Sequence, residues 1–167
     1  MTELFYKEIP SPVGKLKLVA NSSALVAVLW ERERPNRVKL NTMTLAPQQP
    51  ILVAAERQLK EYFAGARTEF DLPLKPDGSE FQKKVWQALR EIPFGRTRSY
   101  LDLAKAVGSA KAARAVGAAN GKNPLSIIVP CHRAIGSDGS LTGFAGGLET
   151  KAALLALEAR PIVSMNY

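Results

Sequence analysis

The sequence holds 167 residues, of which 46% are hydrophobic, so it is long enough for one domain or two small ones with a buried core. This composition excludes a disordered chain, and no stretch is long and apolar enough for a signal core or a membrane span. The formal net charge is +8, and residues 80–167 carry most of it, with 12 Lys/Arg against 6 Asp/Glu. We therefore expect a cytoplasmic protein whose second half faces a polyanion.

The first half of the chain is typical of a small α/β domain, which we place at residues 1–75. Three apolar or alternating segments, separated by turns rich in Pro, Gly, Asn and Ser, predict the strands of a short antiparallel sheet: residues 4–9, 15–20 and 24–30. The last segment is nearly all apolar, which favours a helix packed over the sheet. An apolar stripe over residues 51–64, with Gly65 where a left-handed cap would stand, predicts that covering helix. The charged segment 31–50 predicts a loop or a weak short helix.

The second half is predicted as a mostly helical domain over residues 76–167. Prolines and a glycine within residues 71–78 disfavour regular structure, so we place the domain boundary there. Cap and stop residues predict four helices: residues 80–92, 100–107, 110–120 and 148–159. The helix starts are marked by Ser79 with Gln82, by Ser99 with Asp102, and by Ser109. Gly108 turns the chain between the second and third helices, a spacing typical of a helix-turn-helix, although an ordinary helical hairpin has the same shape.

Charge and side-chain size favour DNA as the partner of this helix pair. Between Phe81 and Lys122 there are nine Lys/Arg and two acidic residues. The predicted helix 110–120 is rich in Ala and Gly, so it can approach a DNA groove closely. Arg114 is the long cation among these small residues, and we expect it to enter a groove or the base stack, the alternative being a solvated arginine on an exposed face.

Cys131 and His132 are the only cysteine and the only histidine, and they stand side by side after an apolar run that ends at Pro130. A thiolate is a strong nucleophile, and an imidazole that takes its proton, with Arg133 to favour the anion, lowers a thiol pKa. A lone cysteine is also commonly a small buried hydrophobe, but these neighbours and the glycine-dense segment 142–147 favour a nucleophile. Because neighbouring side chains of an extended chain point to opposite faces, either the backbone turns after Pro130 or a water relays the proton.

The same two residues limit the other chemistry that the chain can carry. A single cysteine excludes an internal disulfide. One cysteine and one histidine are too few for the usual structural zinc sites, although a site made of carboxylates alone stays open. These two residues therefore give no reason to expect a metal site.

The motifs around the cysteine resemble a known family. Pro130-Cys131-His132-Arg133, preceded by Arg114-Ala115-Val116-Gly117 and Gly121-Lys122-Asn123-Pro124 and followed by Gly146-Gly147, resembles the O6-alkylguanine-DNA alkyltransferases, the methylated-DNA–protein-cysteine methyltransferases. The likeness runs without a gap from about Tyr100 to Glu158. It implies a small α/β domain followed by a mostly helical domain with a winged-helix-like helix-turn-helix.

The resemblance implies a DNA repair activity. The alkyl group of O6-alkylguanine, and of O4-alkylthymine, would pass irreversibly to the protein's own cysteine, once per molecule, because a thioether has no carbonyl for water to attack. The lesion lies inside a duplex, so the nucleotide would be flipped out. The implied partner is double-stranded DNA containing O6-alkylguanine, and we expect a monomer that needs neither a cofactor nor a membrane.

The resemblance also assigns residues to roles, position by position. The catalytic set is Cys131 as acceptor, His132 as base through a water, Glu158 as the carboxylate that orients His132, and Asn123 as the residue that pins the turn beside the cysteine. The DNA-binding set is Tyr100, which pushes on the backbone, Arg114, which fills the gap left by the flipped nucleotide, and Ser137. The substrate pocket is assigned to Phe144, Ala145, Pro130 and Arg133. Without the resemblance, Glu158 would be interpreted as an ordinary solvated glutamate.

The sequence departs from the family pattern in the pocket. Phe144 stands where many members have a tyrosine, Ala145 where some have a serine, and Ala134 where a branched residue is common, so the preferred alkyl group stays open. Two other functions are also left open. A non-catalytic damage-binding module is disfavoured by the presence of Cys131, and a cysteine hydrolase is disfavoured because its cysteine and histidine are usually distant in sequence.

Overall fold

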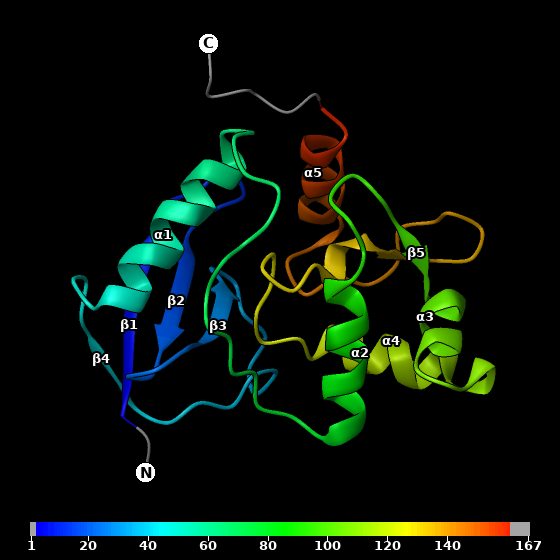
Figure 1. Ribbon diagram of the computed structural model, residues 1–167, viewed down its shortest axis with the longest axis horizontal. Helices are drawn as coiled ribbons and strands as arrows, with labels where there is room; N and C mark the ends of the chain where they lie inside the picture. The colour runs from blue at the N-terminus through cyan, green and yellow to red at the C-terminus, as the bar shows by residue number, and fades with distance from the viewer. Residues whose placement is uncertain (1–2, 161–167) are drawn as a thin grey trace.

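The computed structural model describes residues 3–160 (Figure 1). Strands β1 (Leu4–Ile9), β2 (Leu16–Ala20) and β3 (Leu25–Trp30) form the predicted antiparallel meander. An additional strand that was not predicted, β4 (Met43–Leu45), pairs with β1 in parallel, so the sheet is mixed and its strand order is β3-β2-β1-β4. This short strand lies in the segment predicted as loop, and its three residues are too few to show an alternating pattern.

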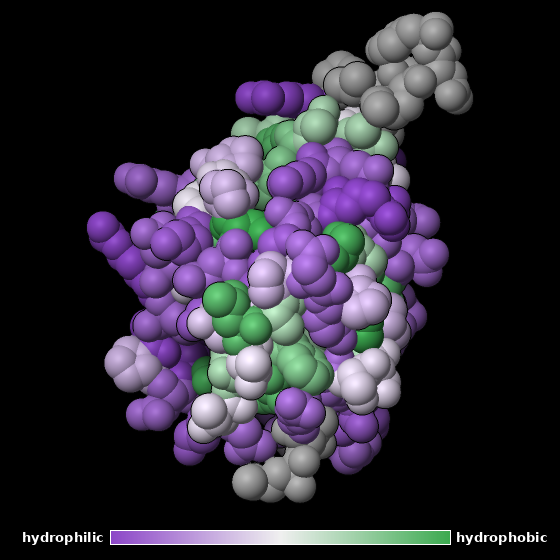
Figure 2. Space-filling view, turned by 90° about the vertical axis from the view of Figure 1, so that its left-hand side faces the viewer, coloured by the Kyte–Doolittle hydropathy of each residue, from purple (hydrophilic) through white to green (hydrophobic). Residues whose placement is uncertain are grey.

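Helix α1 (Pro50–Phe63) covers the sheet, as the apolar stripe predicts. Its buried face includes Leu52, Ala55 and Leu59, which pack into the same core as β2 and β3. Gly65 follows the helix at φ +78°, the left-handed conformation expected of a C-terminal cap. Figure 2 shows the side of the molecule that carries β4 and α1, where hydrophobic patches lie between hydrophilic side chains.

The outer edge of β3 joins the two halves of the chain. The Leu25 N–H donates to the carbonyl of Pro73, at 2.8 Å, in the connection that leads from α1 to the helical half. The Val28 N–H donates to the carbonyl of Pro124, also at 2.8 Å, ahead of the segment that leads to Cys131. The first half therefore helps to place the cysteine.

The second half is helical, with four α-helices in the described range: α2 (Glu80–Arg90), α3 (Tyr100–Ala106), α4 (Ala113–Gly121) and α5 (Leu148–Glu158). Two short strands, β5 (Arg98–Ser99) and β6 (Ala134–Ile135), pair in parallel. Both predicted capping boxes are present, Ser79 with Gln82 and Ser99 with Asp102. Among residues 3–160, no helix is both long and apolar enough to cross a membrane.

The start of the third helix differs from the prediction. Ser109 makes no capping hydrogen bond, and a 3₁₀ turn, η1 (Ala110–Ala112), precedes α4. The Ser109 N–H donates to the carbonyl of Ala104 at the end of α3, and the Ala112 N–H donates to the carbonyl of Ser109. Backbone hydrogen bonds, rather than the Ser109 side chain, therefore close the start of this helix. Gly108, at φ +99°, makes that turn, and α3 and α4 pack together as a helix-turn-helix.

Candidate active site

Cys131 is delivered by a tight turn rather than by a strand. The Val129 N–H donates to the carbonyl of Leu125 at 2.8 Å, and Ile127 within the turn has φ +73°. A β-branched residue in the left-handed region costs about 1–3 kcal/mol, so surrounding contacts must hold it there. The Asn123 side chain supplies two of them, since its Nδ2 donates to the carbonyl of Val129 at 2.9 Å and its Oδ1 accepts from the Leu125 N–H at 3.0 Å.

The backbone turns directly after Pro130, but within residues 3–160 this turn gives Nδ1 of His132 no hydrogen-bond partner, so it does not take the place of a water relay. Cys131 begins a 3₁₀ turn, η2 (Cys131–Arg133), and its side chain is buried. Burial raises the pKa of the Cys131 thiol above its ordinary value. The Asn123 side chain and the positive charges of Arg37 and Lys151 act in the opposite direction. The resting cysteine is therefore a neutral thiol that needs a base.

Glu158 lies at the centre of a buried hydrogen-bond network. Its Oε2 is 2.7 Å from Nε2 of His132, and its two oxygens accept from Nε and Nη2 of Arg133 at 2.7 and 3.0 Å. The Tyr62 hydroxyl donates to the same carboxylate at 2.6 Å. Burial alone would raise the pKa of Glu158, but the hydrogen bonds from His132 and Arg133 lower it to about 2. The carboxylate is thus ionised and buried, and it is not the solvated glutamate of the alternative interpretation.

His132 is fully buried and has one free ring nitrogen. Its Nδ1 has no hydrogen-bond partner within the part of the chain that the structure describes. Burial lowers the pKa of His132, although the Glu158 carboxylate raises it. With the proton on Nε2 directed at Glu158, Nδ1 carries a lone pair and can accept a proton.

Arg133 takes a different position from the one expected. Besides binding Glu158, its Nη1 donates to the carbonyl of Ile92 at 2.7 Å, and its guanidinium lies 5.8 Å from the Phe94 ring. The sequence predicted that this cation would favour the thiolate. The structure instead directs it to Glu158, and the charges that lower the pKa of Cys131 belong to Arg37 and Lys151.

Two buried residues of this region were missed at the level of sequence. Lys151 in α5 is fully buried, and its Nζ donates to the carbonyls of Ala134 at 2.6 Å and Thr142 at 3.2 Å. Its spacing from Leu154 and Glu158 puts it on the buried face of α5, a signal that the sequence does contain. Tyr62 gave no such signal, because it belongs to the apolar stripe of α1, 96 residues from Glu158.

A cavity of about 660 Å³ lies between α4 and the glycine-dense loop. Phe144 and Ala145 line it, together with Gly117 and Ala118 of α4. Phe144 packs edge-on against Trp30 of β3, with ring centroids 5.5 Å apart. Cys131 is not part of the lining. Neither are Pro130 and Arg133, which border a separate cavity of about 230 Å³.

The predicted DNA-binding residues lie on accessible parts of the second half. Arg114 is exposed on α4, whose opposite face buries Val116 and Ala119. Tyr100 starts α3, half-buried, and its hydroxyl accepts from Thr142 Oγ1 at 3.3 Å. Ser137 is exposed in the turn that follows β6.

Comparison with known proteins gives a consistent match over the whole described chain. Residues 4–76 match the family of the 6-O-methylguanine DNA methyltransferase ribonuclease-like domain, and residues 80–160 match that of the 6-O-methylguanine DNA methyltransferase DNA binding domain. The methylated-DNA–protein-cysteine methyltransferase of Methanosarcina acetivorans is 44% identical over 93% of this chain and 98% of its own length. The constitutive Bacillus subtilis enzyme of the same name is 46% identical over 92% of this chain and 94% of its own. The crystal structure of Mycobacterium tuberculosis OGT in complex with DNA superposes with a TM-score of 0.86 at 46% identity, covering 93% of this chain and 92% of that one.

Proposed function

This chain belongs to the 6-O-methylguanine DNA methyltransferase family and has the activity of a methylated-DNA–protein-cysteine methyltransferase that repairs O6-methylguanine, and we propose that Cys131 is its alkyl acceptor. One observation carries the assignment of the site. The only cysteine of the chain is held by the Asn123 turn next to a buried His132–Glu158 pair whose free Nδ1 can take a proton. The damage-binding and hydrolase alternatives therefore give way to alkyl transfer.

The proposed reaction begins with the proton of the thiol. A bridging water passes this proton from Cys131 to Nδ1 of His132, and the Glu158 carboxylate stabilises the imidazolium through Nε2–H. The sulfur then attacks the alkyl carbon. A carbon–sulfur bond forms as the carbon–O6 bond breaks, and the electron pair of that bond leaves with O6. The resulting guanine anion takes up a proton from water at ring nitrogen N1, which balances the proton that His132 has accepted. The product is a thioether, so each molecule acts once.

The proposed DNA interface is built around α4. The lesion leaves the duplex stack, Arg114 occupies its space, and Tyr100 and Ser137 contact the backbone. Phe144 and Ala145 form the wall against which the flipped base stacks. The excess of cations between Phe81 and Lys122 supports this placement. From the family resemblance we extend the proposal to other O6-alkylguanines and to O4-alkylthymine in double-stranded DNA. The proposed active form is a cytoplasmic monomer.

The test is to incubate the protein with a duplex that carries one O6-methylguanine and to measure the mass of the intact protein. We expect a gain of one methyl group per molecule, located at Cys131 by peptide mapping. Cys131→Ser should bind the duplex and gain nothing. Repair of more than one equivalent of lesion by one equivalent of protein would contradict the proposal.

A further inference from the structure

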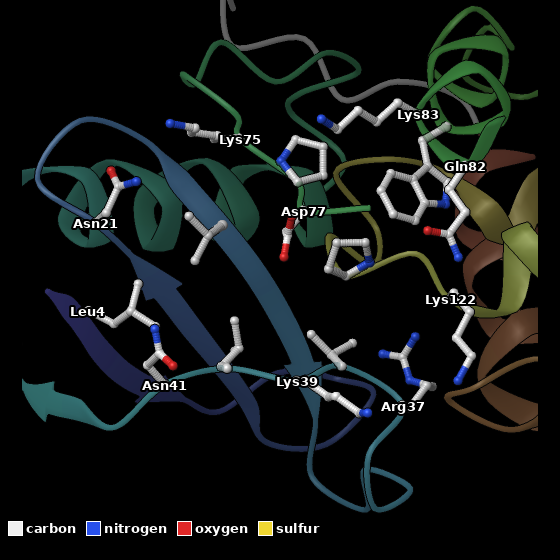
Figure 3. Close-up of a pocket in the computed structure, with 16 residues that line it drawn as sticks. Leu4, Asn21, Arg37, Lys39, Asn41, Lys75, Asp77, Gln82, Lys83 and Lys122 are labelled. Carbon is white, nitrogen blue, oxygen red and sulfur yellow. The ribbon is translucent and has the colours of Figure 1, made fainter. Parts of the chain in front are cut away.

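A third cavity, of about 500 Å³, lies between the two halves of the chain and shares no lining residue with the predicted catalytic set (Figure 3). One wall comes from the sheet side, including Val26 and residues 37–41. The others come from residues 75–77, which connect α1 to α2, from α2 itself, and from the end of α4. Its volume lies within the range of about 300–1,000 Å³ that is usual for small-molecule sites.

The lining of this cavity is strongly basic. It contains five cations and one carboxylate: Arg37, Lys39, Lys75, Lys83, Lys122 and Asp77. In Figure 3, Lys75 and Lys83 lie on one side of the cavity and the other three cations lie on the opposite side, with Asp77 between them. Within residues 3–160, none of the four lysines forms an ion pair, and Asp77 forms none either. Their charges are thus available to a ligand.

Arg37 adds a buried donor to the lining. Its side chain is 3% exposed, its Nε pairs with Glu33, and its Nη1 donates to the carbonyls of Gly121 at 3.1 Å and Asn123 at 2.9 Å. Its Nη2 is buried without a hydrogen-bond partner in the described range. A buried N–H of this kind costs free energy unless an acceptor oxygen satisfies it. The donor set, with the lysines, therefore suits an anion that is rich in oxygen.

We propose that this cavity binds a nucleoside polyphosphate. The phosphates would lie among the lysines, which face one another across the cavity and so surround a small anion better than they would follow a duplex backbone. The nucleoside would lie against the half-buried apolar part of the lining, which is made by Val26, Val38 and Leu40. Because both halves contribute walls, the ligand binds only their assembled arrangement and stabilises the folded protein.

The test measures binding of ATP and of inorganic triphosphate in magnesium-free buffer, by calorimetry and by the shift in Tm. Lys83 and Lys84 are adjacent, exposed lysines of α2, but only Lys83 lines the cavity, so Lys84→Gln is a matched control for Lys83→Gln. We expect wild type and Lys84→Gln to bind alike. Lys83→Gln should weaken binding by about tenfold, the effect of losing one charge-assisted contact. ATP should bind more tightly than triphosphate.

Each other outcome overturns the proposal. Equal weakening by Lys83→Gln and Lys84→Gln, or no binding to wild type, would mean that the lysines only contribute surface charge. If triphosphate bound as tightly as ATP, the nucleoside would make no contact that contributes to affinity, and the cavity would not be a nucleotide site. If Lys83→Gln instead lowered duplex affinity and its salt dependence and left ATP binding unchanged, the lysines would serve the DNA backbone. Binding of ATP does not depend on alkyl transfer, so this test stands apart from that of Cys131.

Discussion

The hydroxyl of Tyr62 in α1 donates to the carboxylate of Glu158 in α5, 2.6 Å away, and so ties the first half of the chain to the proposed catalytic pair. Both residues are buried, and burial together with the nearby carboxylate raises the pKa of Tyr62. The hydroxyl is therefore a permanent donor. The Tyr62 hydroxyl and Nε2 of His132 both contact Oε2 of Glu158, so the hydroxyl helps to hold the carboxylate that orients the imidazole.

Tyr62→Phe should separate this hydrogen bond from the packing of the ring. We expect a loss of about 1–2 kcal/mol in the free energy of unfolding, as for a buried hydrogen bond to a charged group, and slower alkyl transfer. Urea unfolding and single-turnover kinetics measure the two effects. Tyr6→Phe, in the half-buried part of β1, is the control and should change neither. Unchanged transfer in Tyr62→Phe would show that the phenol only stabilises the fold.

His132→Ala should slow methyl transfer by about 10²- to 10⁴-fold, the usual contribution of a general base, while duplex binding is retained. Glu158→Gln should also slow transfer, and it should destabilise the fold as well. Arg133 would be left as a buried cation without its carboxylate, at a cost of about 3–5 kcal/mol. The methyl-transfer rates are compared at a temperature below the Tm of each variant. A wild-type transfer rate in His132→Ala would exclude His132 as the general base.

Stability should fall as the pH is lowered from about 7 toward 2. The folded-state pKa of His132 lies below its ordinary value of 6.5, so below about that pH the unfolded chain binds a proton that the folded protein does not. Glu158, with a folded pKa of about 2 against an ordinary 4.5, contributes stability above pH 4.5 that is lost as the pH falls toward 2. Urea unfolding at several pH values checks the slope. In His132→Ala the free energy of unfolding should change less between pH 7 and 5.5 than it does in wild type. An unchanged slope in this range would rule out His132 as the source of the pH dependence.

Gly146→Ala should disturb the loop that carries Phe144. A Cβ at Gly146 would lie 2.7 Å from Cε2 of Trp30, so the loop or the indole must move. We expect a loss of about 1–3 kcal/mol, typical of overpacking, and slower transfer from duplex DNA. Gly143→Ala in the same loop is the matched control, because its Cβ would meet nothing within 4 Å. Equal effects of the two substitutions would point to loop flexibility rather than to contact with Trp30.

Arg114→Ala should reduce transfer from paired DNA most, from a mismatched or single-stranded lesion less, and from free O6-benzylguanine not at all. The reason is that only the duplex requires the space of a flipped nucleotide to be filled. Rates at saturating protein on the three substrates give the answer. If Arg114 contacted only phosphate, binding to every DNA would weaken alike and its salt dependence would fall. A loss that includes the free base would indicate a folding defect.

Much of the molecule follows from local sequence. The strands of the meander, the helix stripes, and the caps at Ser79 and Ser99 all depend on residues within a few positions of one another, and the structure has them where the pattern predicts. The sequence also predicts the nucleophile, because Cys131 and His132 are adjacent in the chain. Strand β4 was missed because its three residues are too few to show a periodic pattern. The predicted cap at Ser109 was wrong, because a 3₁₀ turn begins there without a side-chain hydrogen bond.

The partners of the site were decided by the tertiary structure alone. The sequence placed Arg133 beside the thiol, but folding brings Glu158 to it from 25 residues away and Tyr62 to Glu158 from 96 residues away. Lys151 is buried against the Ala134 and Thr142 carbonyls in the same manner. Pairings of this kind are set by which buried donors and acceptors remain to be satisfied once the helices pack, and that requirement exists only in three dimensions.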